Sequence, residues 1–358
     1  MAREATTLRK LLSQRKPDIP CLTTATKNTT KCSWPDLHKK NITIWKEFNL
    51  DTLNASYSHV LDLPVSDPLS GVPSINQTFE GLTVNSDLDV NNLIGWNAMM
   101  MKATFDFARS RIGLKQGSPS SHAYSTPNKS TLAKIPGYSP RLQVDHVISL
   151  SCNLPQNLVV GLGRTSKKWR GVDLTCALDQ GRKPTREQTW PLRQLLAICD
   201  IANTRYGYIQ TDKEFVVCRF NKNAAEEWKV AIASIPVGNF GEGVLTADLA
   251  LWWLCMLAAS SKRNSEIVAE EEMVEIDQWA WDEFQGSMVH KYSNYSAPEL
   301  FQMPPFEAQG NPANPVFGVN PADLAFGANP PRPEHQGMAN PIDHDVVQYL
   351  TNPDNDQT

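Results

Sequence analysis

A short basic segment that contains one tryptophan has the composition of a phosphate-binding surface. It covers residues 164–170 and includes Lys167, Lys168, Trp169 and Arg170. Lysine and arginine bind phosphates and an indole ring stacks on a base, so this segment is typical of a nucleic-acid contact. A solvated turn anchored by one tryptophan has the same composition, and both interpretations remain open. A second basic cluster follows in the chain and consists of Arg182, Lys183 and Arg186.

One acidic side chain stands inside an otherwise apolar run. Residues 144–150 alternate in polarity and are rich in β-branched types, which predicts a strand that carries Asp145 and His146. Aspartate is disfavoured in strands, so Asp145 indicates either a functional position or the solvent face of the strand. For His146, a packing or hydrogen-bonding role is favoured over metal binding.

Charge is unevenly distributed along the 358 residues, whose net charge is −4. Residues 128–235 hold 16 Lys and Arg against 9 Asp and Glu, a net charge of +7. Residues 264–358 hold 2 against 16, a net charge of −14. This distribution predicts an anionic partner for the middle of the chain, or an acidic tail that competes for the same surface. An acidic tail that only keeps the protein soluble would give the same counts.

Four further segments predict the centre of an α/β fold. The apolar run 158–162 predicts a second strand, and residues 191–202 have apolar side chains at helical spacing. Residues 206–210 and 215–220 predict a hairpin, because two β-rich runs are separated by a few polar residues. A helix in this position covers one face of the sheet.

Segments on both sides extend this centre. A long helix is predicted over residues 86–112, with Ser86 or Asp87 at its N-cap. Residues 228–235 predict another strand. Residues 245–260 predict a helix that is apolar on several sides and therefore enclosed by the protein or by a partner.

The order of helix, strand with an aspartate, strand, amphipathic helix and strand resembles the restriction-endonuclease-like, or PD-(D/E)xK, nuclease superfamily. It is most similar to uncharacterised fungal relatives in that group. The resemblance covers roughly residues 86–260, and its most specific part is residues 191–220, PLRQLLAICDIANTRYGYIQTDKEFVVCRF. It implies a mixed central sheet flanked by helices and, for an active member, metal-dependent hydrolysis of a phosphodiester.

In such a nuclease, two acidic groups on adjacent strands hold Mg²⁺, which polarises the phosphate and activates water. By this resemblance Asp145 is the first acid and metal ligand, Arg164 replaces a lysine, and Gln194 on the helix supports the site. Leu162 occupies the position of the second acid and cannot bind a metal. The resemblance therefore predicts a degenerate site, with no cofactor, or Mg²⁺ if catalysis survives. Acids that could replace the missing one are Asp173, Asp179, Glu187 and Asp200.

The chain is predicted to have four regions. They are an irregular N-terminal arm (1–85), a nuclease-like α/β core (86–262), an acidic helical segment (263–297) and a disordered tail rich in proline and asparagine (298–358). Within the core, residues 113–140 predict a long loop. Short apolar stretches in the tail are predicted to dock on a protein partner.

Seven cysteines occur without any CxxC pair, and most of them lie in apolar runs, which favours a reducing compartment. The first ten residues lack the apolar core of a signal peptide. The longest apolar run, residues 249–259, is shorter than the roughly 20 residues that span a bilayer. An intracellular protein, nuclear or cytoplasmic and without a membrane contact, is therefore predicted.

Three functions are compatible with these patterns. The first is a degenerate nuclease-like protein that binds DNA, RNA or a protein partner through a basic cleft. The second is an active Mg²⁺-dependent nuclease whose second acid comes from elsewhere in the chain. The third is a structural or interaction module without nucleic acid. Leu162 favours the first over the second, and a contiguous positive cleft would favour the first over the third.

Overall fold

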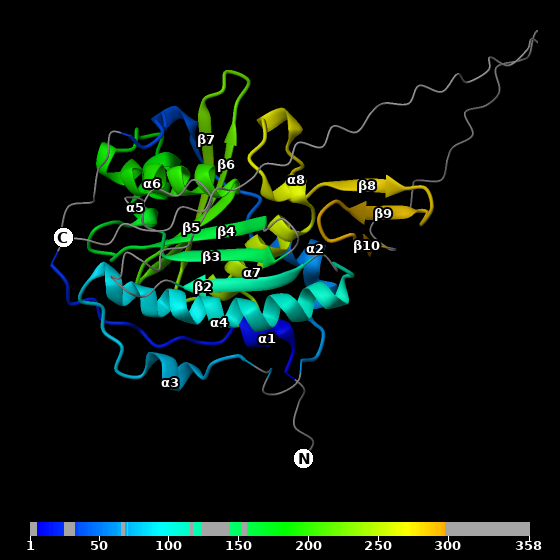
Figure 1. Ribbon diagram of the computed structural model, residues 1–358, viewed down its shortest axis with the longest axis horizontal. Coiled ribbons are helices and arrows are strands. Elements are labelled where there is room, and N and C mark those ends of the chain that lie inside the picture. Colours follow the sequence, from blue (N-terminus) through cyan, green and yellow to red (C-terminus); the bar gives the residue numbers. More distant parts are fainter. Residues whose placement is uncertain are drawn as a thin grey trace, which may run out of the picture. The chain divides into compact units, whose positions relative to one another are not determined.

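A seven-stranded mixed sheet forms the centre of the fold (Figure 1). The computed structural model describes residues 6–24, 33–65, 69, 71–114, 117–123, 144–151 and 156–297. The sheet order is β1-β7-β6-β5-β4-β3-β2. Its strands are β1 Ile42–Ile44, β2 Ser118–Ala123, β3 His146–Ser151, β4 Gln156–Gly163, β5 Tyr206–Gln210, β6 Glu214–Lys222 and β7 Trp228–Pro236. The prediction of an α/β fold with a mixed central sheet is confirmed.

The strands form two antiparallel groups joined by one parallel pair. Strands β2, β3 and β4 form an antiparallel meander, and β5, β6 and β7 form another. Strand β5 runs parallel to β4, and β1 runs parallel to β7 at the sheet edge. A parallel pair requires a crossover, which is supplied by α5 Gly171–Asp179 and α6 Arg186–Ala202.

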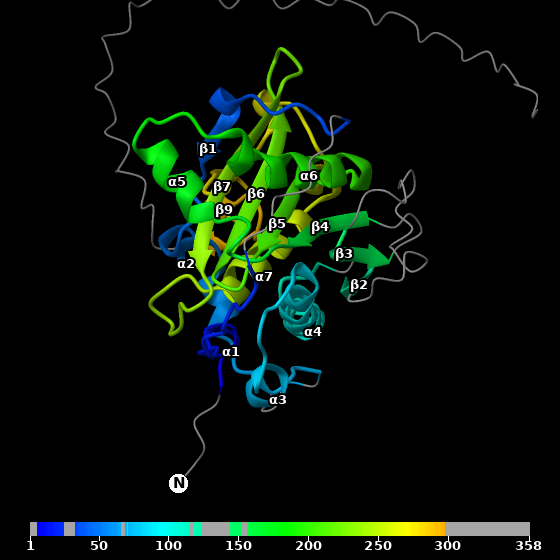
Figure 2. The same ribbon diagram turned by 90° about the vertical axis from the view of Figure 1, so that its left-hand side faces the viewer.

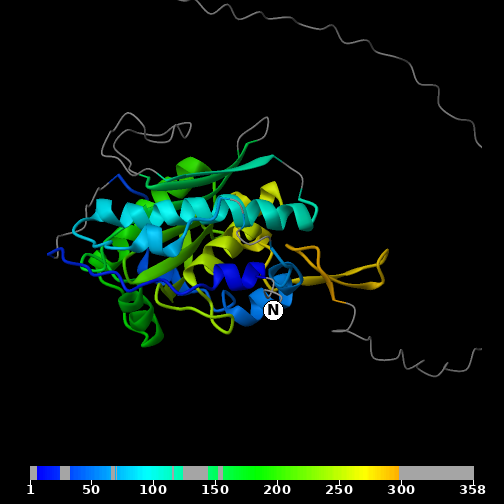
Figure 3. The same cartoon turned by 90° about the horizontal axis from the view of Figure 1, so that it is seen from below.

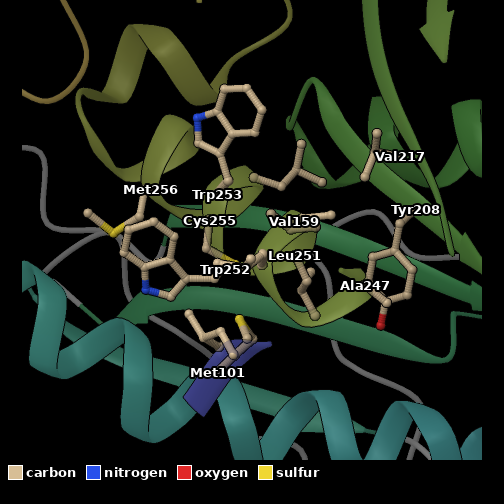
Figure 4. Close-up of a cluster of buried hydrophobic side chains, with 14 of the residues drawn as sticks. Met101, Val159, Tyr208, Val217, Ala247, Leu251, Trp252, Trp253, Cys255 and Met256 are labelled. Carbon is tan, nitrogen blue, oxygen red and sulfur yellow. The ribbon is translucent and has the colours of Figure 1, made fainter. Parts of the chain in front are cut away.

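Helices cover both faces of the sheet (Figure 2). Helices α4 Asp87–Arg111 and α7 Ala247–Ala259 lie over one face, and α5 and α6 lie over the other. Each face therefore buries its own apolar cluster of side chains. Figure 4 shows part of the cluster around α7, where Trp252 and Trp253 pack near Met101 of α4 and Val159 of β4. Both tryptophans are fully buried, as predicted for an enclosed helix.

Local signals set the helix ends. Helix α4 begins with a capping box between Ser86 and Asp89. Ser86 is thus the N-cap, one of the two residues predicted for that position. Helix α6 begins five residues before the predicted start at Pro191, because Thr185 and Gln188 form a second capping box. It ends at Asn203, whose φ of +49° lies in the left-handed region.

The N-terminal part is more ordered than the predicted irregular arm. It contains α1 Leu8–Leu12, the 3₁₀ turn η1 Lys39–Asn41, strand β1, α2 Leu50–Leu61 and α3 Ile75–Phe79. Lys16 forms a buried ion pair with Asp248 of α7 at 2.6 Å. These short apolar segments pack against the main core. Contacts between segments so far apart in the chain cannot be predicted from the residue pattern of the arm itself. The prediction of an irregular arm was wrong for these elements.

The predicted acidic helical segment contains three short strands and only single short turns of helix. After α8 Lys262–Ser265 and the 3₁₀ turn η2 Glu270–Glu272, the chain forms a separate three-stranded antiparallel sheet in the order β10-β9-β8. Figures 1 and 3 show that this small sheet projects from the rest of the described structure. The helix prediction was wrong because the aromatic residues alternate with a period of two. Its strands are β8 Trp279–Asp282, β9 Ser287–His290 and β10 Ser296–Ala297.

Two further predictions concern loops and the tail. Part of the predicted loop 113–140 is strand β2, which pairs with β3 at the edge of the main sheet. Its Ser- and Pro-rich composition is typical of a loop, so the sequence did not predict this strand. Residues 124–143 and the predicted disordered tail, 298–358, lie outside the described residues. Within the described ranges, no helix has both the length and the apolarity to cross a membrane.

Candidate functional site

Asp145 holds the end of the β3–β4 pair together. It immediately precedes β3 and is 2% exposed. Its backbone N–H donates to the carbonyl of Gly161 at 3.1 Å, and its Oδ2 accepts from the backbone N–H of Gly163 at 2.8 Å. These two bonds join Asp145 to β4 on both sides of Leu162, so Asp145 stabilises this end of the strand pair.

Arg164 and Gln194 extend this arrangement to α6. One guanidinium nitrogen of Arg164 donates to the carbonyl of Gly163, and another donates to Oε1 of Gln194. Both side chains are buried, and the backbone N–H of Arg164 also donates to the carbonyl of Gln210 at 2.9 Å. The structure thus brings Asp145, Arg164 and Gln194 together: Asp145 and Arg164 bond the N–H and the carbonyl of Gly163, and Gln194 bonds Arg164.

Leu162 lies at the predicted position of the second acid and is fully buried in the apolar cluster beneath α6. On the opposite face, a Cβ on Gly163 would lie 3.1 Å from Oδ1 of Asn91 and 3.3 Å from the side chain of Ile94, so α4 packs closely there. Among the described residues, no group of three His, Cys, Asp or Glu side chains is arranged to hold a metal ion. The four suggested replacement acids are exposed on α5 and α6: Asp173, Asp179, Glu187 and Asp200.

A buried polar network lies on the α4 side of the same strands. Nδ1 of His146 is 2.5 Å from the hydroxyl of Tyr208, and its Nε2 is 2.8 Å from Oγ of Ser121. The amide nitrogen of Asn97 donates to the Tyr208 hydroxyl at 3.5 Å and to Oε1 of Gln210 at 3.2 Å. Burial raises the pKa of Tyr208, so its phenol stays protonated. His146 is therefore a hydrogen-bonding residue, as its sequence context favoured.

The basic segment 164–170 is a folded loop held by acids from two other elements. Lys168 forms an ion pair with Asp87 at the start of α4, at 2.5 Å. The backbone N–H and hydroxyl of Ser166 both donate to the carboxylate of Asp212 at 2.7 Å. Trp169 is 4% exposed and its indole N–H donates to the carbonyl of Gln188 at 2.9 Å. Trp169 therefore packs in the core and offers no ring for the predicted base stacking.

Two pockets flank the first turns of α6. The smaller, about 260 Å³, is lined by Lys167, Lys168 and Arg170 together with residues of α6. The larger, about 550 Å³, lies between η1 and α6. Arg182, from the second predicted basic cluster, is exposed but lines neither pocket. The cationic side chains of the larger pocket, hereafter the α6 pocket, are Lys39, Lys40, Lys183, Arg186 and Arg193.

The two arginines of the α6 pocket are held in place by an aromatic side chain. The guanidinium carbons of Arg186 and Arg193 lie 4.9 and 4.5 Å from the centre of the Trp190 ring. Arg193 also donates to the backbone carbonyls of Trp34 and Pro35, at 2.8 and 2.9 Å. Cation–π contacts and carbonyl acceptors orient these guanidinium groups before any ligand arrives.

Sequence reasoning found Lys183 and Arg186 of this pocket but missed Lys39, Lys40 and Arg193. The Lys39-Lys40 pair stands more than 140 residues before α6, and nothing local connects the two segments. The available signal was the spacing of Arg186, Trp190 and Arg193, which places both arginines beside one aromatic ring on the helix.

Neither the family models, nor the curated proteins, nor the solved structures include a match to this chain.

Proposed function

We propose that this chain is a catalytically degenerate relative of the restriction-endonuclease-like proteins that binds nucleic acid through the α6 pocket. The observation that carries the proposal is the pocket itself, which is lined by five lysine and arginine side chains from η1, the loop before α6 and α6. Asp36, the one acidic residue that lines it, pairs with Arg193 at 3.8 Å, and Lys40 pairs with Glu227 at 3.4 Å, so the lining keeps an excess of positive charge. Such a concentration of positive charge favours a polyanion such as DNA or RNA.

The order of elements supports the proposed kinship. Helix α4 is followed by β2, β3 and β4, then by α5 and α6, and then by β5 parallel to β4. Asp145 stands at the start of β3, and Arg164 follows the end of β4. This is the order of helix, strands, helix and strand on which the resemblance rests. Asp145 and Arg164 lie at neighbouring ends of the paired strands β3 and β4.

The environment of Asp145 supports the loss of catalysis. Mg²⁺ prefers several oxygen ligands in octahedral geometry, which nucleases supply with more than one carboxylate. Here one carboxylate already accepts a backbone N–H from Gly163, and its strand neighbour Leu162 is apolar and buried. Arg164 keeps a positive charge near this point, and its guanidinium is bonded to Gln194. These residues do not fit a Mg²⁺ site.

A binding titration at two salt concentrations tests the proposal. The probes are a labelled 20-nucleotide single strand and the matching duplex, measured by fluorescence anisotropy. We expect salt-dependent binding by the wild type, because phosphate contacts release counterions. The double variant Lys183→Glu/Arg186→Glu should weaken binding at least tenfold. It should also lower the salt slope by about 2, because it replaces two phosphate-binding side chains.

The matched control is Lys262→Glu/Arg263→Glu on α8, which changes the net charge equally at exposed residues outside the pocket. Its effect should be clearly smaller. Equal losses of affinity in both double variants would show that binding depends on net charge alone and not on the α6 pocket. Absence of wild-type binding at both salt concentrations would remove the proposed function.

Catalysis is tested separately with plasmid DNA and added Mg²⁺ or Mn²⁺. We expect no cleavage by the wild type beyond that of a mock preparation. Cleavage that disappears in Asp145→Ala would overturn the degenerate-site part of the proposal and favour an active nuclease.

A further inference from the structure

The hairpin of β8 and β9 presents an aromatic tip away from the main sheet (Figure 3). Its pairing runs from Trp279 opposite His290 to Asp282 opposite Ser287. Phe284 in the turn is 103% exposed, more than any other large apolar side chain in the described ranges. Trp281 on β8 is 47% exposed. Two exposed aromatic side chains so close together are typical of an interaction surface.

The turn is held in one conformation by its own side chain and backbone. Oδ1 of Asp282 accepts from the backbone N–H groups of Phe284 at 2.8 Å and Gln285 at 3.1 Å. The N–H of Gly286 donates to the carbonyl of Asp282 at 2.8 Å, and Gly286 has a φ of +60°, which glycine adopts without strain. The backbone at Phe284 is therefore fixed before any partner binds, which lowers the entropy cost of association.

The base of the hairpin is rigid as well. His290 is fully buried, with Nε2 2.9 Å from the carbonyl of Ile276 and Nδ1 3.0 Å from Oγ of Ser293. The hydroxyl of Tyr292 donates to the carbonyl of Val274 at 2.6 Å. The exposed tip thus stands on a base that is tied to the chain around it.

The segment that leads from η2 into the hairpin tip is acidic. Residues 270–283 contain seven Asp and Glu and no Lys or Arg. Lys229, Arg263 and Arg219 pair with Glu270, Glu272 and Glu275 respectively. Of these seven acids, the four without a Lys or Arg partner among the described residues are Glu271, Asp277, Asp282 and Glu283. This charge repels nucleic acids and anionic membranes and attracts a cationic surface.

We propose that the β8–β9 hairpin is a docking element that packs Phe284 against an apolar patch with a basic rim on a partner protein. Phe284 supplies the buried anchor, because a few aromatic residues carry most of the binding energy in protein interfaces. The acidic side chains around it pair with the basic rim and increase the association rate. This surface is distinct from the α6 pocket, and the proposal does not depend on nucleic-acid binding.

A parallel selection tests this proposal. A phage-displayed library of random 16-residue peptides is selected on the wild-type protein and on Phe284→Ser. We expect the wild type alone to enrich peptides that combine several Lys or Arg with a large apolar residue. No enrichment, enrichment of acidic or neutral peptides, or equal enrichment on both proteins would overturn the proposal.

The most enriched peptide is then synthesised and titrated by fluorescence anisotropy. Phe284→Ser should weaken its binding about tenfold or more, as expected for an interface anchor. The matched control is Phe240→Ser, because Phe240 is another exposed phenylalanine, 50% exposed, outside the hairpin. It should leave affinity unchanged, and an equal loss would contradict the assignment. The double variant Asp277→Asn/Glu283→Gln should weaken peptide binding at low salt, and the loss of affinity should be smaller at high salt.

Sedimentation of the wild type at increasing concentration separates this partner from a second copy of the chain. We expect a monomer in the range used for the titrations. A dimer that disappears in Phe284→Ser would make the occupant another copy and would overturn the proposal of a different, basic protein.

Discussion

The α6 pocket and the β8–β9 hairpin are both fixed surfaces, but they differ in charge and in their connection to the core. The pocket presents two arginines of α6, a helix that packs on the main sheet, together with lysines from η1 and from the loop before α6. The hairpin presents aromatic and acidic side chains on a separate small sheet. The opposite charges are the reason for proposing opposite partners, a polyanion for the pocket and a basic protein for the hairpin.

The difference in connection has an energetic consequence. Trp190, which orders the two arginines of the pocket, is 4% exposed and belongs to the apolar cluster under α6. The groups that order Phe284 lie within its own turn. Damage to the pocket should therefore lower the stability of the whole fold, whereas damage to the hairpin tip should stay local.

The largest effect is expected for Trp190→Ala. Truncation of a buried tryptophan leaves a cavity, so the free energy of unfolding should fall by about 3–5 kcal/mol. Urea unfolding followed by circular dichroism measures this change. The matched control is Trp281→Ala in the hairpin, which should change stability by no more than about 0.5 kcal/mol. Similar losses in the two variants would break the comparison between the two regions.

The second effect is a loss of stability in acid that arises at the base of the hairpin. Burial lowers the pKa of His290 below its ordinary value of 6.5, so the folded protein holds this ring neutral. The unfolded chain takes up the proton first as the pH falls below about 6.5, the unperturbed histidine value. This stability is complete above that pH and is lost as the pH falls through the lower pKa of the folded state.

The slope from one such histidine is at most about 1.4 kcal/mol per pH unit. Burial lowers the pKa of His59 as well, and its contribution has the same sign. Urea unfolding of the wild type and His290→Gln at pH 7.5, 6.5 and 5.5 isolates the His290 part. The variant should lose less stability between pH 6.5 and 5.5 than the wild type. Parallel curves would show that His290 does not titrate in this range.

The third effect is confined to the hairpin tip. Asp282→Ala removes two hydrogen bonds to backbone N–H groups in an exposed turn, which should cost about 1 kcal/mol locally. Amide hydrogen exchange should become faster at Phe284 and Gln285, while exchange in β5 and α7 stays unchanged. Faster exchange throughout the main sheet would show that the two regions unfold together.

The smallest effect is expected for Phe284→Ser. A side chain that is fully exposed makes little contribution to folding, so thermal unfolding should change by no more than about 0.5 kcal/mol. A larger destabilisation would mean that Phe284 packs within the protein and would remove it as a docking residue.

The elements around Asp145 were predictable because their signals are local. The alternating run at 144–150, the hairpin of β5 and β6, and the caps at Ser86 and Thr246 all act over a few residues. By contrast, β2 and the small sheet of β8 to β10 were missed. Pairing partners stabilise these strands, and the composition of β2 by itself favours a loop.

For the candidate site, sequence reasoning reached the residues but not their surroundings. It placed Asp145, Arg164 and Gln194 in one region, and they meet around Gly163. It left Trp169 either a stacking role or an anchoring role in a turn, and the burial of Trp169 against α6 excludes stacking. Whether a tryptophan faces solvent depends on which elements cover it, and the types of its neighbours in the chain do not specify this.

The amino-acid sequence alone determined the helix caps, the strand and helix periods of the centre, and the excess of positive charge in the middle of the chain. These properties depend on interactions within a few residues or on simple counts. Only the tertiary structure decided that Lys39 and Lys40 join Arg186 and Arg193 in one pocket, and that Phe284 is fully exposed in the β8–β9 turn. Sheet order and core packing bring distant segments together, because burial of apolar surface is non-directional and is optimised over the whole chain.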